Sequence, residues 1–105
     1  MSDYINKIQS HEYILNTYEL VKEWEIWVDH HHIGPQKITI KIHEGNDGRY
    51  HYTTSHMYQG TQQAGPYLSS DSSATTIESA VDKAIRQLFA FFNIDDEGAR
   101  WVEAK

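Results

Sequence analysis

The chain has 105 residues, a formal net charge of −6 and no cysteine, which excludes disulfides, thiolate metal sites and a cysteine nucleophile. Its 15 acidic residues outnumber 9 scattered basic ones, so the charge pattern argues against a nucleic-acid partner. No apolar run is long enough to cross a membrane, and the N-terminus lacks the basic and apolar regions of a signal peptide. We therefore expect a cytoplasmic protein with no membrane or nucleic-acid partner.

The first 20 residues are the hardest to interpret. Tyr4, Ile5 and Ile8 begin a loose apolar stripe with helical spacing, which predicts a short helix from about Tyr4 to Leu15. Residues 13–21 also favour a strand, so the first strand could begin as early as Tyr18.

Three alternating segments then predict strands over residues 22–30, 37–43 and 49–58. Gly34-Pro35 marks the first turn, and Asp47-Gly48 gives a tight hairpin turn. The third segment has two faces of similar polarity, so its register is the least defined. The residues expected on the buried face of the first two strands are Trp24, Ile26, Val28, His30, Ile38, Ile40 and Ile42.

A long polar connection, residues 60–74, leads to an amphipathic helix predicted over Thr76–Phe92. Thr75 and Glu78 form a capping-box pattern at its start. The apolar stripe expected to face the sheet consists of Ile77, Val81, Ala84, Ile85, Leu88 and Phe92. Gln87 falls on the side expected to face solvent, and Phe89 and Phe91 fall away from the stripe. Residues 93–105 are expected to be a C-terminal extension anchored by Trp101.

Together these elements predict an α+β fold in a single small domain, residues 1–105. Its order is α-β-β-β-α: an antiparallel three-stranded sheet, a C-terminal amphipathic helix packed on one face, and a short N-terminal helix within residues 1–20.

Aromatic residues make up 12% of the chain, and one sheet face is expected to lack a helix. Aromatic side chains are common in the buried centre of protein interfaces. We therefore predict a small non-enzymatic protein–protein interaction module, an accessory or inhibitor protein, which forms a homodimer. A monomer that covers these rings itself is the alternative. The predicted interaction surface consists of Trp27, Tyr50, Tyr52, Tyr58 and Tyr67.

Seven histidines suggest a second hypothesis, a ligand- or metal-binding protein. His30 and His32 alternate on one strand face and could bind zinc, copper or nickel, with His43 or His51 as a third ligand. Solvated histidines at a strand end explain the same tract, so no cofactor is predicted. The third hypothesis is a small enzyme whose residues meet only in the folded chain. Ser55-His56 lacks the Gly-x-Ser-x-Gly context of a hydrolase, and no catalytic residue is assigned.

The element order over residues 4–92 is similar to that of double-stranded-RNA-binding domains. That family holds phosphates with a basic cluster at the start of its last helix. Here the corresponding residues, 71–78, are acidic and contain no lysine, so the resemblance implies the order of elements and not RNA binding. The size and charge are also similar to those of small acidic inhibitor proteins of phages, by analogy alone.

Overall fold

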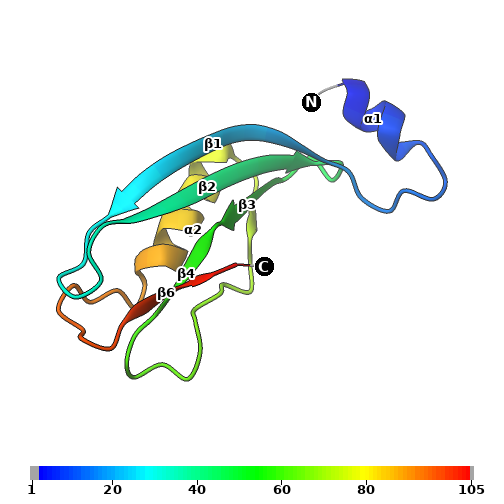
Figure 1. Ribbon diagram of the computed structural model, residues 1–105. Helices are drawn as coiled ribbons and strands as arrows, with labels where there is room; N and C mark the ends of the chain where they lie inside the picture. Colours follow the sequence, from blue (N-terminus) through cyan, green and yellow to red (C-terminus); the bar gives the residue numbers. More distant parts are fainter. Residues whose placement is uncertain (1–2, 105) are drawn as a thin grey trace.

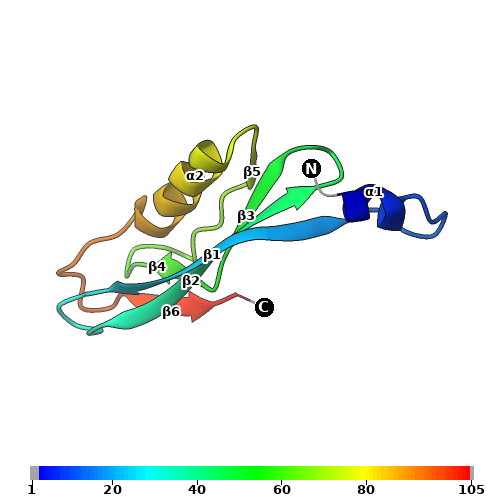
Figure 2. The ribbon, with the colours of Figure 1, turned by 90° about the horizontal axis from the view of Figure 1, so that it is seen from above.

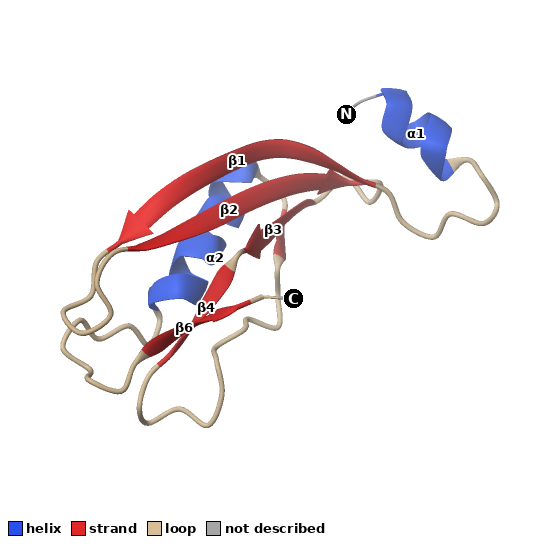
Figure 3. Cartoon of the chain, in the orientation of Figure 1, coloured by secondary structure: helices blue, strands red, loops and turns tan. Residues whose placement is uncertain are grey.

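The computed structural model describes residues 3–104 and confirms the α+β fold (Figures 1 and 3). Antiparallel pairing joins four strands in the order β1-β2-β3-β5 and two more as β4-β6. The helices are α1 (Asp3–Gln9) and α2 (Ile77–Phe89). The strands are β1 (Tyr18–Val28), β2 (Gln36–Gly45), β3 (Tyr50–Thr54), β4 (His56–Gln59), β5 (Ser73–Ala74) and β6 (Arg100–Glu103). In this part of the chain no helix is long and apolar enough to cross a membrane.

The predicted hairpin of the first two strands is present, and its register sets the inner face of the main sheet. Trp24 lies opposite Ile40 and Ile26 opposite Ile38, so these side chains share a face. Ile42 lies opposite Tyr52 of β3, which continues the same face across the sheet. A bulge between Leu20 and Lys22 interrupts the pairing of β1 with β2. Beyond the bulge, from Trp24 onward, the inner face continues across β1, β2 and β3.

The helix α2 packs on this inner face and closes the core (Figure 2). Ala80, Ala84 and Leu88 of α2 are fully buried on the side of the helix that faces the sheet. The two alanines allow the helix backbone to lie close to the sheet. Ile38 and Ile42 are also fully buried. Each such aliphatic side chain contributes about 2 kcal/mol when it leaves water, so this layer holds the sheet to the helix.

The predicted third strand, residues 49–58, is divided at Ser55 into β3 and β4. The Ser55 backbone N–H donates to the Thr39 carbonyl at 2.9 Å, and the Thr39 N–H donates to Ser55 Oγ at 2.8 Å. The Ala104 N–H donates to the Ser55 carbonyl at 2.9 Å. Ser55 thus forms hydrogen bonds with the backbone of β2 on one side and with the backbone of the C-terminal tail on the other. The chain leaves the main sheet here, and β4 pairs with β6, a strand that the sequence did not predict.

Packing also changes several positions predicted for the helix. Thr76, not Thr75, is the N-cap, and its Oγ1 accepts a hydrogen bond from the Ser79 N–H at 3.1 Å. The helix ends at Phe89. Gln87 is buried and Ile85 is 45% exposed, the reverse of the prediction for both. The reason is that α2 lies over β3, so the helix face turned to the sheet is shifted toward Gln87.

The N-terminal segment projects from the body of the molecule (Figures 1 and 2). We call residues 3–16 the N-terminal arm. Its helix α1 ends at Gln9 and is therefore shorter than predicted. The side-chain Nε2 of Gln9 donates to the backbone carbonyls of Ile14 and Leu15, which follow the helix. The molecule measures 50 × 24 × 20 Å and its Cα radius of gyration is 16.0 Å, against about 13 Å for a compact chain of this length.

Candidate interaction surface and histidine pocket

The strand β1 forms one edge of the main sheet. It spans 11 residues and pairs with β2 on one side, and within residues 3–104 no strand pairs with its other side. In an antiparallel sheet, alternate residues direct their backbone N–H and C=O groups to opposite sides of the strand. The outer side of β1 therefore presents a row of donors and acceptors that another strand could join.

Large apolar side chains lie on both faces of this edge. Trp27 is on the outer face of the sheet and is 67% exposed. Trp24 is on the inner face and was predicted to be buried, yet it is 39% exposed because α2 covers β3 and β2 rather than β1. The edge strand thus keeps an aromatic ring accessible above and below its free side.

One flank of α2 adds to the same apolar region. The opposite flank is fixed to the far strands, since Gln87 bonds Thr54 of β3 and Lys83 bonds the Ser73 carbonyl of β5. Ile85 and Phe89 therefore lie on the flank turned away from β3 and β5, and they are 45% and 38% exposed. We define the β1 edge surface as strand β1 with the side chains Trp24, Trp27, Ile85 and Phe89.

Aromatic contacts connect the end of α2 to the end of β1. The rings of Phe89 and Phe92 lie 5.3 Å apart, and Phe92 meets His30 edge to face at 5.7 Å. His30 follows β1 by two residues. This contact series fixes the flank of α2 that carries Phe89 relative to the edge strand.

The outer face of β1 also carries two carboxylates. Lys41 Nζ lies 3.5 Å from a Glu23 carboxylate oxygen, and Lys37 Nζ lies 3.9 Å from Glu25. Both glutamates remain about half or more exposed, and exposed pairs of this kind contribute at most about 1 kcal/mol. Both lysines belong to β2, so the free side of β1 presents the carboxylates.

The structure places the five predicted surface residues differently from one another. Trp27 is strongly exposed, as predicted. The prediction is wrong for Tyr52 and Tyr58, which are 3% and 0% exposed. Tyr50 is half-buried against the core, and Tyr67 is half-buried with its ring 5.0 Å from that of Phe91.

Register explains why the two tyrosines were misassigned. Tyr52 lies opposite Ile42 on the inner face, and the break at Ser55 turns Tyr58 into a second aromatic layer with Phe92 and Trp101. Neither the register of β3 nor the break at Ser55 has a clear polarity signal in the sequence. Trp24 and Ile85, which the sequence placed in the core, supply the exposed apolar surface in their place.

The predicted metal ligands do not come together. His30 is 1% exposed, and its Nε2 bonds the Asn93 carbonyl at 2.8 Å while its Nδ1 accepts from the His32 backbone N–H at 3.1 Å. Both ring nitrogens are thus engaged. His43 and His51 lie at the other end of the β1–β2 hairpin. Among residues 3–104, no group of three or more His, Asp or Glu side chains is placed to hold a metal ion.

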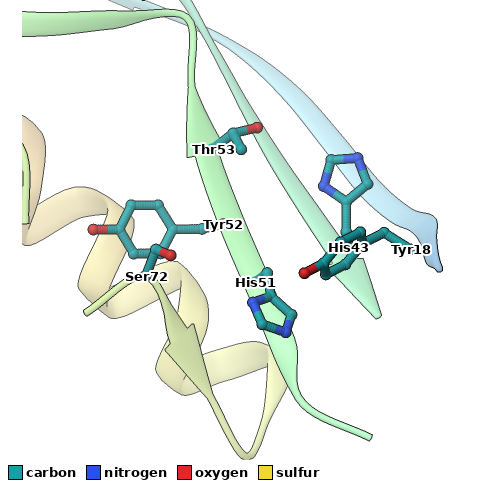
Figure 4. Close-up of a pocket in the computed structure, with 6 residues that line it drawn as sticks. All are labelled: Tyr18, His43, His51, Tyr52, Thr53 and Ser72. Atoms are coloured by element: carbon teal, nitrogen blue, oxygen red, sulfur yellow. The ribbon is translucent and has the colours of Figure 1, made fainter. Parts of the chain in front are cut away.

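His43 and His51 are instead opposite residues of β2 and β3, and both line an open pocket of about 310 Å³ (Figure 4). The residues that line it are Tyr18, His43, His51, Tyr52, Thr53 and Ser72. The ring of Tyr18 meets His51 edge to face at 5.1 Å, and His51 Nε2 lies 3.0 Å from Asp47 Oδ2. Asp47 therefore orients the His51 ring and leaves its Nδ1 for another partner.

Two neighbouring groups at this pocket have displaced pKa values. Burial, followed by the charges of Lys41 and His51, lowers the pKa of His43 below its ordinary value of 6.5. The pKa of Asp47 is lowered chiefly by the hydrogen bond from the Arg49 backbone N–H, with a further contribution from His51. The pocket can thus offer a neutral imidazole and an oriented one to a polar ligand.

Ser55 and His56 also form a hydrogen-bonded pair, with 2.8 Å between Ser55 Oγ and His56 Nδ1. Ser55 Oγ also accepts from the Thr39 N–H, so one hydroxyl contacts both the backbone of β2 and the imidazole. The pair sits at the point where the chain passes from one sheet to the other. Its contacts account for that structural role.

Comparison of the chain with protein-family models, curated proteins and solved structures gives no match.

Proposed function

We propose that this is a small, non-enzymatic cytoplasmic protein that binds another protein through the β1 edge surface, as an accessory or inhibitor protein. The observation that carries the proposal is the 11-residue edge strand flanked by exposed Trp24 and Trp27. Adding a strand to an exposed sheet edge is a recurring mode of protein recognition. In it the main chain supplies hydrogen bonds and alternate side chains supply specificity.

The side chains around the edge suit that mode. An added strand would place its inner side chains beside Trp24 and over the exposed flank of α2, where Ile85 and Phe89 lose contact with water. Its outer side chains would lie beside Trp27. Tryptophan is among the residues that dominate binding energy when they are enclosed at an interface. The homodimer that was predicted from the sequence is one form of the proposed function if the two copies pair through this edge.

The test is affinity capture with two matched double variants of the full chain. Trp24→Ala with Trp27→Ala removes the rings at the edge, while Tyr13→Ala with Leu15→Ala removes two side chains of the N-terminal arm that are 81% and 85% exposed. We expect the edge variant to lose its bound protein at least about tenfold, and the arm variant to keep it. Equal retention by both variants would contradict the proposal.

A second candidate function is binding of a small polar ligand at the pocket between His43 and His51. The hydrogen bond from His51 to Asp47 supports it, because an oriented imidazole is what such a site requires. Titration with zinc, followed by NMR of the histidine ring protons, tests the metal form of this candidate. A response at His43 and His51 that is lost in His51→Asn would support it. A response at His31 or His32 alone would contradict it.

A further inference from the structure

We infer that the β1 edge accepts a strand of a different protein, one that alternates apolar residues with lysine or arginine, in preference to a second copy of this chain. The inference rests on the proposed function and concerns the chemistry of the partner at the same surface. It follows from which side chains share each face of β1 and from the symmetry that a homodimer would impose.

The faces of β1 follow from its register with β2. Glu23 lies opposite Lys41, Glu25 opposite Thr39 and Trp27 opposite Lys37, all on the outer face. Trp24 and Ile26 lie opposite isoleucines on the inner face. The free edge therefore presents two carboxylates and a tryptophan outside, and apolar side chains inside.

Two copies of β1 paired antiparallel would be related by a two-fold axis perpendicular to the sheet. Side chains that face each other across such a pair point to the same side, so the axis must pass beside one residue of β1. Each choice of that central residue defines a complete register. The charges that each register sets opposite each other can therefore be compared.

Every register centred on residues 22–25 sets like charges of β1 opposite each other. Centring on Lys22, Glu23 or Glu25 pairs that residue with its own copy, and centring on Trp24 pairs Glu23 with Glu25 twice. Centring on Ile26 or Trp27 brings Glu23 or Glu25 opposite Asp29, which follows the end of β1. Registers centred on Leu20 or Val28 set no like charges opposite, but they pair five residues of β1 or fewer. Like charges directly opposite across a strand pair are destabilising, so the registers that would pair most of β1 with its own copy are disfavoured.

The strand β2 already shows which chemistry suits β1. It places Lys41 opposite Glu23, and Lys37 within 3.9 Å of Glu25. Its three isoleucines cover the inner face. A strand of the same pattern on the free side would set cations beside Glu25, which is 64% exposed, and beside Glu23, which is 47% exposed. The net charge of −6 also favours approach of a basic segment.

The probe is a capped synthetic peptide with the sequence of Gln36–His43, the β2 segment itself. The control peptide carries Glu in place of Lys37 and Lys41. Each is titrated into the full-length, isotope-labelled protein, and backbone amide shifts are followed by NMR. We expect the basic peptide to shift amides of β1 and the side-chain N–H signals of Trp24 and Trp27. We expect the acidic peptide to bind at least about tenfold more weakly.

A charge-swapped protein, Glu23→Lys with Glu25→Lys, should reverse the preference for the two peptides. If that variant does not fold, salt dependence of the wild-type protein gives an independent readout. Raising the salt from about 20 mM to about 300 mM should weaken the basic peptide several-fold, because exposed charges are then screened.

The outcomes separate this inference from the proposed function. Equal binding of both peptides at β1 would overturn the charge preference and keep the edge as the binding surface. A dimer in solution whose β1 amides are protected would overturn the inference in favour of a second copy, and the proposed function would stand. A monomer whose β1 amides respond to neither peptide would overturn both.

Discussion

Tyr52 and Gln87 are joined by a buried hydrogen bond, in which the tyrosine hydroxyl donates to Gln87 Oε1 at 2.7 Å. The same oxygen accepts from the Ser69 backbone N–H at 3.0 Å, and Gln87 Nε2 donates to Thr54 Oγ1 at 3.1 Å. One side chain of α2 thus connects the helix with β3 and with the long 60–74 connection. Buried polar groups are stable only when they are bonded in this way.

Replacing Gln87 by Ala should destabilise the protein by about 2–3 kcal/mol, because it leaves the buried Tyr52 hydroxyl and the Ser69 N–H without their acceptor. Urea unfolding followed by circular dichroism measures the change. Gln62→Ala, at an exposed glutamine of the 60–74 connection, is the matched control and should stay within about 0.5 kcal/mol of wild type. Equal stability of the two variants would show that the buried bonds do not form.

Trp101 of β6 allows the contribution of the second sheet to be measured. Its ring lies 5.2 Å from Tyr58 and 6.1 Å from Phe92, and its Nε1 is buried with no hydrogen-bond partner among residues 3–104. Trp101→Ala should cost about 2–4 kcal/mol through lost packing. Trp101→Phe keeps an aromatic ring and removes the unpaired donor, so it should cost about 1 kcal/mol or less. Chemical denaturation of both variants tests this, and equal losses would contradict the packing described.

The histidine pocket predicts a pH dependence of stability. His43 has a lowered pKa in the folded protein, so below its ordinary pKa of 6.5 the unfolded chain binds the proton more readily. Its contribution is therefore complete above pH 6.5 and is lost as the pH falls through the folded pKa. Between about pH 7.5 and about pH 5.5, wild type should lose more stability than His43→Gln. His11→Gln, at an exposed histidine of the N-terminal arm, should behave as wild type does.

The N-terminal arm should be dispensable for folding. The body begins at Thr17, whose carbonyl accepts from the Asn46 N–H at 2.9 Å and whose N–H donates to Asn46 Oδ1 at 3.2 Å. A chain that begins at Thr17 should keep a cooperative thermal transition. It loses the bond from Thr17 Oγ1 to Gln9 and the burial of Ile5, which is 2% exposed but lies outside the core cluster, so we expect a cost of about 1–3 kcal/mol. Small-angle scattering should show the radius of gyration falling toward about 12 Å. Loss of cooperative unfolding would contradict this.

Residue types alone predicted the interaction surface only in part. The aromatic content predicted such a surface, and Trp27 is exposed as expected. Of the tyrosines chosen beside it, Tyr52 and Tyr58 are buried and the other two are half-buried. Trp24 was assigned to the core by its alternation with Ile26, and alternation does identify its face correctly. Alternation cannot tell whether a helix covers that face at the edge strand, because coverage depends on where α2 lies.

The amino-acid sequence was enough to predict the α+β class, the β1–β2 hairpin with its inward isoleucines, and the presence of α2. These features follow from side-chain periodicity and turn residues, which act over a few neighbouring positions. The tertiary structure decided the break at Ser55, the pairing of β4 with β6, the burial of Gln87 and the exposure of Ile85. Each of these depends on segments tens of residues apart meeting in space. Such contacts satisfy backbone groups and exclude water in ways that leave no local pattern in the chain.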